Sequence, residues 1–159
     1  MSERRELPIV VLCGPTGVGK TRVAVALSRR LGGEIIGADS VQVYRGFDIG
    51  SCKPTRDELM GVRHHLLDVV EPDEGIDAAR FAALADAAID DVARRGKIPF
   101  VVGGTGLWLR ALLRGLVALP PVDDALRARL SQTWRKLGPD AMHAQLSAID
   151  PLSAARVHA

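Results

Sequence analysis

The octapeptide GPTGVGKT at residues 14–21 fills every fixed position of the G-x-x-x-x-G-K-[ST] phosphate-binding loop. An apolar, strand-like stretch from Ile9 to Cys13 precedes it, and a helical pattern from Val23 to Leu31 follows it. A strand, a glycine-rich turn and a helix in this order predict that a phosphate or pyrophosphate binds at the turn. The loop does not identify the reaction, because kinases, GTPases, ATPases and some group transferases share it.

Each residue type in this loop has a physical role. Gly14, Gly17 and Gly19 reach backbone angles closed to other residues, so successive N–H groups turn inward and surround an anion at a helix N-terminus. Lys20 adds a full positive charge. The hydroxyl of Thr21 is a hard oxygen ligand, which suits a Mg²⁺ ion that bridges phosphate oxygens.

The composition is that of an ordinary globular domain. The 159 residues are 47% hydrophobic and 25% charged, which is enough for one substantial core. The net charge of +2 indicates no nucleic-acid partner by itself, and the paired arginines are typical of solvated helix faces.

No stretch is long enough to span a membrane, and the charged N-terminus is unlike a signal peptide. Cys13, expected in a buried strand, and Cys52 are too few for a disulfide framework, which favours reduced thiols in a cytoplasmic protein.

Short apolar runs alternate with helical patterns along the first part of the chain. After the phosphate loop, the expected elements are strands at 34–38, 64–70 and 98–102 and helices from the cap Asp77 to Gly96 and from Leu107 to Leu113. This repetition predicts a P-loop α/β fold of three layers, with a parallel sheet between helices. Ligands of such sheets bind outside the carboxyl ends of the strands. We therefore expect the phosphate loop, Asp39-Ser40 and the turn at 103–105 to converge on one crevice.

The pattern becomes helical towards the end of the chain. An acidic pair at 123–124 is suited to cap a helix, Gly-Pro at 138–139 breaks it, Asp140 begins a second helix, and Asp-Pro at 150–151 begins a third. The predicted organisation is therefore a P-loop α/β core over residues 1–119 and the start of a helical appendage over residues 120–159.

Three further features are candidates for function. Asp39 is suited to be a magnesium ligand, a general base or the cap of the next turn, and the polar run from Asp39 to Gly46 suits either a base edge or a plain loop. His64 and His65 would point to opposite faces of a strand without an evident third ligand, so a structural or substrate-contact role is favoured over metal binding. The glycine-rich turn at 103–106 suits close approach of a ligand, tight helix packing, or both.

Five motifs in collinear order resemble the tRNA dimethylallyltransferase family, also called tRNA isopentenyltransferases or IPP transferases. They are GPTGVGKT (14–21), DSVQVYRGFDIGSCKPT (39–55), GVRHHLLDVVEP (61–72), IPFVVGGTGLW (98–108) and IDPLSAARVH (149–158). This set is far more specific than the phosphate loop alone. The resemblance implies transfer of a dimethylallyl group from dimethylallyl diphosphate, with Mg²⁺, to N6 of adenosine 37 in tRNAs that read codons starting with U.

The resemblance also implies roles for matched residues. The diphosphate would be bound by Gly14, Pro15, Thr16, Gly17, Val18, Gly19, Lys20 and Thr21. Thr21 would be the metal ligand, and Asp39, Thr105 and Lys20 would be catalytic, with Asp39 as the general base toward N6. The residues implied to contact tRNA are Asp39, Ser40, Val41, Gln42, Thr105 and Arg127. The family resemblance further implies a cytoplasmic protein, with no membrane partner, that works as a monomer.

Members of this family continue for about as many residues again, with further strands of the sheet and a basic segment on tRNA. We therefore expect this chain to be truncated at its C-terminus and its sheet to have an unprotected edge. The rival hypotheses are an adenylate dimethylallyltransferase that uses free AMP, a small-molecule P-loop kinase, and a non-catalytic anion-binding fragment. Arg127 and Arg129 on the helical appendage favour a macromolecular acceptor over AMP.

Overall fold

The structure is a computed structural model that describes residues 8–117 and 123–158. It consists of two compact units, Met1–Leu116 and Val117–Ala159, and each unit is described by itself. The domain boundary expected between residues 119 and 120 lies outside the described residues. In the described part of the chain, no helix has the length and apolar character needed to cross a membrane.

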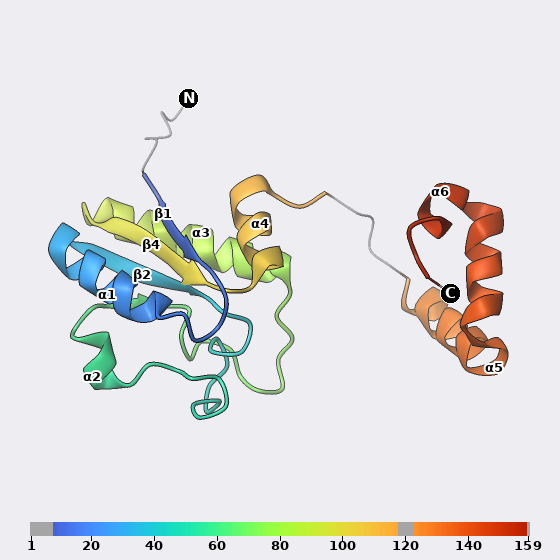
Figure 1. Ribbon diagram of the computed structural model, residues 1–159, viewed down its shortest axis with the longest axis horizontal. Coiled ribbons are helices and arrows are strands. Elements are labelled where there is room, and N and C mark those ends of the chain that lie inside the picture. Colours follow the sequence, from blue (N-terminus) through green and yellow to red (C-terminus); the bar gives the residue numbers. More distant parts are fainter. Residues whose placement is uncertain (1–7, 118–122, 159) are drawn as a thin grey trace. The chain divides into compact units, whose positions relative to one another are not determined.

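A parallel sheet forms the centre of the first unit (Figure 1). Its strands in the described residues are β1 (Val10–Cys13), β2 (Gly33–Ala38), β3 (His64–His65) and β4 (Ile98–Gly103), in the order β1-β4-β2-β3. Every pairing is parallel, and Val101 of β4 is in register with Val11 on one side and Ile36 on the other. Because the paired strands are parallel, the chain must cross over between consecutive strands, which confirms the predicted parallel α/β fold.

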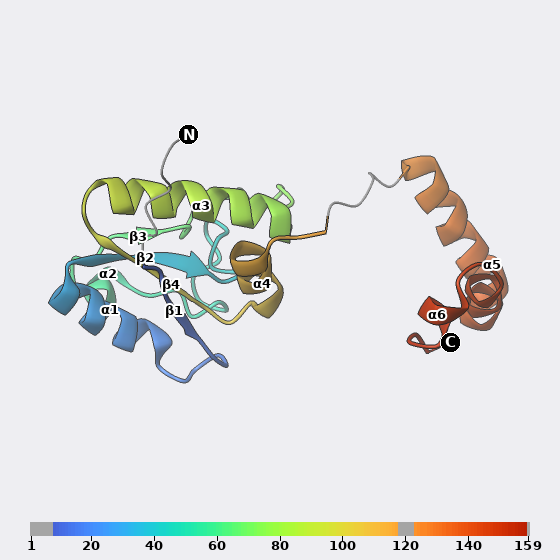
Figure 2. The same ribbon diagram turned by 90° about the horizontal axis from the view of Figure 1, so that it is seen from above.

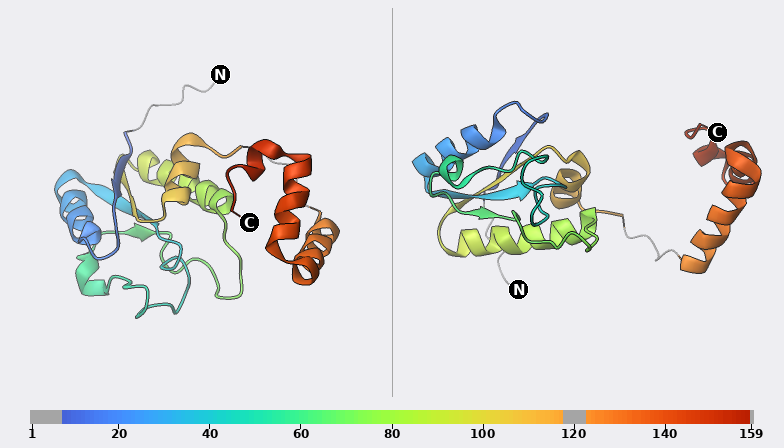
Figure 3. Two further views of the ribbon diagram at one scale, coloured as in Figure 1. Left: turned by 45° about the vertical axis from the view of Figure 1, so that its right-hand side comes forward. Right: turned by 90° about the horizontal axis from the view of Figure 1, so that it is seen from below.

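Helices cover both faces of this sheet, as Figure 2 shows from above and Figure 3 from two other directions. The helices of the first unit are α1 (Lys20–Leu31), α2 (Arg56–Leu59), α3 (Ala78–Arg94) and α4 (Gly106–Arg114). Side chains alternate along the strands, so Ile35 and Phe100 pack with α1 while Ile36 and Val101 pack with α3 and α4. The sheet therefore separates two hydrophobic cores, and the predicted three layers are confirmed.

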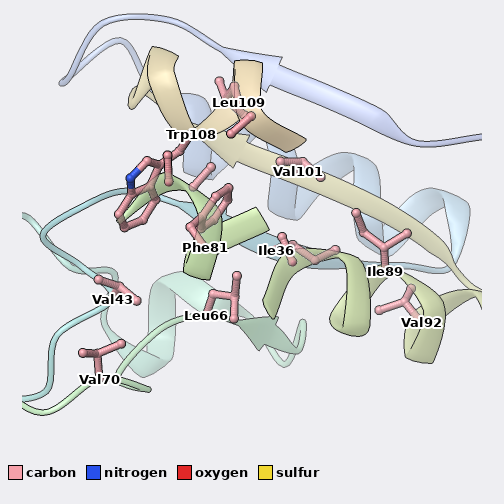
Figure 4. Close-up of a cluster of buried hydrophobic side chains, with 14 residues drawn as sticks. Ile36, Val43, Leu66, Val70, Phe81, Ile89, Val92, Val101, Trp108 and Leu109 are labelled. Atoms are coloured by element: carbon pink, nitrogen blue, oxygen red, sulfur yellow. The ribbon is translucent and has the colours of Figure 1, made fainter. Parts of the chain in front are cut away.

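The larger core lies on the α3 and α4 face (Figure 4). Phe81 of α3 is completely buried and stacks on Trp108 of α4, with ring centroids 4.5 Å apart. Aromatic stacking adds to the burial of apolar area. Val43 and Leu66, from the segments that follow β2 and β3, pack into the same core. The loops that leave the sheet on this side are thereby held to the core.

Two details of the first unit differ from the sequence-based expectation. The strand expected at 64–70 is only His64–His65, because Leu66 and Asp68 have positive φ angles (59° and 56°) that end the extended backbone. Cys13, expected in a buried strand, is exposed, because it is the last residue of β1, an edge strand of the described sheet.

The second unit is helical, as predicted. Helix α5 (Asp124–Ile149) is interrupted at Gly138, where φ is 79° and the backbone is not helical, and α6 (Pro151–Ala154) follows. The predicted caps are present: the carboxylate of Asp123 accepts from the backbone N–H of Ala125, and that of Asp150 accepts from Ser153. The appendage is thus two helical segments, joined at the predicted Gly-Pro break, with a short third helix.

A buried carboxylate lies at the amino end of β2. The side chain of Glu34 is only 3% exposed and is bonded by Arg95, Lys97 and His65. One oxygen accepts from Arg95 and from Lys97 Nζ (2.7 Å), and the other accepts from Arg95 Nη2 (2.7 Å) and contacts His65 Nε2 (2.7 Å). Hydrogen bonds from Arg95 first, and then from Lys97 and His65, hold the pKa of Glu34 well below its usual range despite burial. This cluster ties the ends of α3 and β4 to β2.

We expect Glu34→Gln to lower the free energy of unfolding by about 3 kcal/mol at pH 7, because Arg95, Lys97 and His65 lose the buried carboxylate to which they are bonded. The folded-state pKa of Glu34 is depressed, so its ionisation stabilises the fold above the unfolded-state pKa of about 4.3. This contribution is lost as the pH falls below that value, and the difference between wild type and variant should therefore narrow. Urea unfolding at pH 7 and at about pH 3 measures both effects.

Glu74→Gln is the matched control, because Glu74 is 46% exposed and pairs with Arg80 on the surface. Exposed pairs contribute at most about 1 kcal/mol. Equal destabilisation by the two substitutions, or a Glu34→Gln effect that does not change with pH, would contradict a stabilising role for the buried cluster.

Candidate anion-binding and substrate site

The phosphate loop joins β1 to α1 in the way that its sequence predicts. Gly17 and Gly19 have left-handed φ angles of 81° and 88°, which glycine adopts without strain. Gly19 is the N-cap of α1 and has no side chain to satisfy the first N–H groups of the helix, which remain available to an anion. The ammonium of Lys20 donates to the carbonyl of Pro15 at 2.8 Å, so its charge lies over the loop. The geometry is that of an anion-binding helix N-terminus.

A cavity of about 640 Å³ opens beside this loop at the carboxyl ends of the strands. Its wall contains Lys20 and Thr21 from the loop, Gly103 from the end of β4, and Asp39 and Gln42 from the segment after β2. Ligands of parallel α/β sheets bind at this edge. The phosphate loop and the polar segment after β2 therefore face the same space.

Asp39 caps the turn that follows β2. One carboxylate oxygen, Oδ1, accepts from the backbone N–H groups of Val41 (2.9 Å) and Gln42 (3.1 Å). The other oxygen, Oδ2, has no protein hydrogen bond among the described residues. Capping and proton transfer therefore do not exclude each other here, because they use different oxygens of one carboxylate.

Thr105 connects the ends of the two central strands. Its hydroxyl oxygen accepts from the backbone N–H of Ser40 at 3.1 Å and lies 3.4 Å from the Ser40 hydroxyl, to which it donates. Its own backbone N–H donates to the carbonyl of Ala38 at 3.3 Å. Thr105 thus orders the backbone beside Asp39, a contact that its position in a glycine-rich turn did not reveal.

The glycine-rich turn after β4 packs against its neighbours without room for side chains. A Cβ atom at Gly103 would lie 2.0 Å from the carbonyl oxygen of Ala38, and one at Gly104 would lie 3.2 Å from that of Gly14. The first of these distances is impossible for real atoms, and the second is tight. The turn therefore has a packing role, and it brings β4 against both β2 and the phosphate loop.

Other predicted site residues lie elsewhere. His65 contacts the buried carboxylate of Glu34, and His64 Nδ1 lies 3.0 Å from the carbonyl of Val62, which are structural contacts. Burial lowers the pKa of His64. No group of three or more metal-ligating side chains occurs within the described residues. Arg127 is exposed on α5, in the second unit, and so is placed independently of the cavity.

Sequence reasoning missed Lys53. Its side chain is only 6% exposed, and its ammonium is bonded to Asp48 and Asp68 as well as to a backbone carbonyl. Lysines are rarely buried unless they are paired. Asp48, five residues before Lys53 in the same polar stretch, was a visible candidate partner in the sequence. Asp68 is 15 residues away, and local spacing does not indicate that it pairs with Lys53.

Comparison with known proteins gives a consistent result. Residues 42–159 match a family model described as IPP transferase. A tRNA dimethylallyltransferase of Anaeromyxobacter sp. (strain Fw109-5) is 64% identical over 149 residues, which are 94% of this chain and 50% of that protein. One from Exiguobacterium sp. is 47% identical over 155 residues, 97% of this chain and 50% of that protein.

Solved structures of the same family resemble this chain as well. The full-length tRNA isopentenylpyrophosphate transferase of Bacillus halodurans superposes with a TM-score of 0.68 at 44% identity, over 94% of this chain and 50% of that one. A eukaryotic dimethylallyltransferase acting on tRNA superposes with a TM-score of 0.77 at 32% identity, over 94% of this chain and 37% of that one. The chain thus spans about half the length of the curated relatives that it matches.

We expect Gly104→Ala to weaken pyrophosphate binding about tenfold, because a methyl group 3.2 Å from the carbonyl of Gly14 must push the backbone of the phosphate loop away by a few tenths of an ångström. Gly106→Ala is the control: Gly106 is the first residue of α4, and a Cβ atom there meets nothing within 4 Å. Calorimetric titration of each variant with Mg²⁺ and pyrophosphate measures the affinity. Equal affinities for the two variants would show that the turn does not set the position of the loop.

Proposed function

Because the chain belongs to the IPP transferase family, we propose that it carries the donor site and base-contacting segment of a tRNA dimethylallyltransferase. The reaction would move the dimethylallyl group from dimethylallyl diphosphate to N6 of adenosine 37 in tRNAs that read codons starting with U. The observation that carries the proposal is that the phosphate loop shares one cavity with Asp39 and Gln42. A donor anion and an acceptor base could then meet at the carboxyl edge of the sheet.

The phosphate loop would bind the diphosphate, which is the leaving group. When the bond between the dimethylallyl carbon and the diphosphate oxygen breaks, the electron pair stays with the oxygen and negative charge grows on pyrophosphate. The N-terminus of α1 and the ammonium of Lys20 lie where they would stabilise that charge. Fixed donors of this kind accelerate the step because they need no rearrangement as the charge develops.

Asp39 would act as the general base toward the attacking amine. As N6 of the adenine forms its bond to the dimethylallyl carbon, it must lose a proton, and the Asp39 oxygen not used in capping is the candidate acceptor. Thr105 would keep this carboxylate in place through the neighbouring backbone of Ser40. A base of this kind requires the target adenine to leave its stack, since N6 is otherwise out of reach.

Magnesium fits the residues that are present. Thr21 lines the cavity at the first turn of α1, and its hydroxyl is the type of oxygen ligand that Mg²⁺ accepts beside phosphate oxygens and water. The protein would therefore supply Thr21, and the diphosphate would supply further oxygens. Bound there, Mg²⁺ would neutralise charge on the leaving group.

Arg127 is proposed to contact tRNA from the second unit. It lies in the first turns of α5 near Arg129 and Arg135, and it is exposed. Arginine suits phosphate contacts because its guanidinium presents several donors in a fixed plane. The proposal also includes a cytoplasmic protein that works as a monomer.

The test is incubation of this chain with Mg²⁺, labelled dimethylallyl diphosphate and an unmodified tRNA that contains A36-A37-A38, with AMP in a parallel reaction. The Bacillus halodurans relative serves as the positive control for the assay. Label on tRNA supports the proposal, and label on AMP would replace it with the adenylate enzyme. Pyrophosphate binding without any label would leave an anion-binding fragment, and ATP binding with phosphoryl transfer would favour a kinase.

We expect Asp39→Asn to retain diphosphate binding and to lower transfer by about 100-fold or more, the range seen when a general base is removed. Asparagine keeps the oxygen that caps the turn, so the substitution removes the base without removing the acceptor. Single-turnover transfer and pyrophosphate affinity are measured side by side. The control is Asp77→Asn, since Asp77 caps α3 in the same way outside the cavity. Normal transfer by Asp39→Asn would exclude the role as base.

A further inference from the structure

The ammonium of Lys53 is shielded from solvent near the proposed site, and the proposed mechanism gives Lys53 no role. Its ammonium donates to the backbone carbonyl of Tyr44 (2.8 Å) and to the carboxylates of Asp48 (2.7 Å) and Asp68 (2.6 Å). An ammonium has three hydrogens, so these three acceptors satisfy it completely. Its side chain is 6% exposed. The carboxylates of Asp48 and Asp68 are 66% and 46% exposed, so a shielded ammonium is here covered by two carboxylates that face solvent.

The three acceptors come from three segments of the chain. Tyr44 belongs to the turn after β2, Asp48 to the loop that returns toward α2, and Asp68 to the segment after β3. The segments also share backbone hydrogen bonds, from Lys53 to Asp48 at 3.2 Å and from Val69 to Val43 at 2.9 Å. Lys53 therefore lies where residues 42–45, 47–53 and 66–70 meet, and its single positive charge is shared by two carboxylates there.

Gln42 lines the cavity and is hydrogen-bonded to this junction. The side-chain amide of Gln42 donates to the backbone carbonyls of Ser51 (2.9 Å) and Cys52 (3.2 Å), which directly precede Lys53. Carbonyl groups only accept, so these contacts identify the amide nitrogen and leave the Gln42 oxygen, Oε1, as the remaining polar atom of the side chain. A glutamine held in this way offers a ligand an acceptor only.

We propose that Lys53 is a positioning residue for the acceptor base: it holds residues 51–52 so that Gln42 presents its carbonyl oxygen to an exocyclic amine in the cavity. This inference rests on the proposed function, which supplies the amine as adenine N6. An acceptor at this place favours a base with an amine and disfavours one with a keto oxygen, since two acceptors cannot hydrogen-bond to each other. Lys53 would thereby act on base selection without touching the base.

The charge of Lys53 agrees with this role. Burial alone would lower the pKa of Lys53, but the hydrogen bonds to Asp48 and Asp68 outweigh it, and the pKa is raised. The ammonium is therefore charged at neutral pH. Methionine has a similar length but no charge and no donors, so Lys53→Met removes the interaction with little change in volume.

The experiment compares wild type and Lys53→Met for binding to two anticodon stem-loops that differ only in adenine or hypoxanthine at position 37. Hypoxanthine has a keto oxygen where adenine has its amine. We expect the variant to bind the adenine RNA about 10- to 100-fold more weakly, the scale for a misplaced binding group, and to lose its preference over hypoxanthine. Pyrophosphate affinity should stay within about twofold of wild type, because the phosphate loop is not part of the junction.

Lys97→Met is the matched control. Lys97 is also a lysine bonded to a carboxylate, but its partner is Glu34 at the amino end of β2, away from the cavity at the carboxyl ends. It should change stability and leave the preference for adenine intact. If Lys53→Met does not fold by circular dichroism, Asp68→Asn takes its place, since asparagine keeps an acceptor and removes only the charge.

Hydrogen exchange separates this inference from the proposed function. Amides of residues 42–53 should exchange faster in Lys53→Met than in wild type, whatever the acceptor is. Unchanged exchange together with an unchanged preference for adenine would overturn the inference. If wild type itself shows no preference for adenine, base recognition in the proposed function fails, and the role of Lys53 in base selection fails with it. Faster exchange in Lys53→Met would then show only that Lys53 orders residues 42–53.

Discussion

The close approach of β2 and β4 at their carboxyl ends is the constraint on which the site depends. No side chain fits at Gly103, because a Cβ atom there would lie 2.0 Å from the Ala38 carbonyl oxygen. The next residues then reach the phosphate loop at Gly14 and, through Thr105, the backbone of Ser40. One backbone contact without side chains thus brings the donor loop and the acid after β2 to the same cavity. The hydrophobic cores on the two faces support the site indirectly, because they hold together the strands β2 and β4 that make this contact.

Two buried charges lie at opposite ends of β2 and have opposite consequences. Glu34 at the amino end is bonded by Arg95 and Lys97, at the end of the sheet opposite the cavity. Lys53 at the carboxyl end is bonded by Asp48 and Asp68 and orders loops that face the cavity. Either charge would be costly if unpaired. The first pairing therefore contributes to stability, whereas the second also gives long loops a defined shape where a substrate would bind.

The sequence predicted those parts of the structure that depend on neighbours along the chain. The phosphate loop, the Asp77 and Asp123 caps and the Gly138 break are local, and each is present. What it did not predict depends on distant partners. Glu34 meets Arg95 and Lys97 across 61 and 63 residues, and Lys53 meets Asp68 across 15, so no periodicity reveals them. The third strand was predicted too long because Leu66 and Val70 are buried like strand residues, although the positive φ angles of Leu66 and Asp68 end the extended backbone.

The phosphate loop stabilises the charge of a diphosphate regardless of which bond to it is broken, so it cannot itself distinguish a kinase from a group transferase. The distinction must come from what faces the loop. Here that surface is supplied by residues 39–63, the long connection between β2 and β3, which brings a carboxylate and an amide acceptor to the cavity. Connections of this length are usually functional. A carboxylate and an amide side chain in one cavity suit binding and deprotonation of a nucleophilic nitrogen. The connection between β2 and β3, and not the phosphate loop, would therefore decide the reaction.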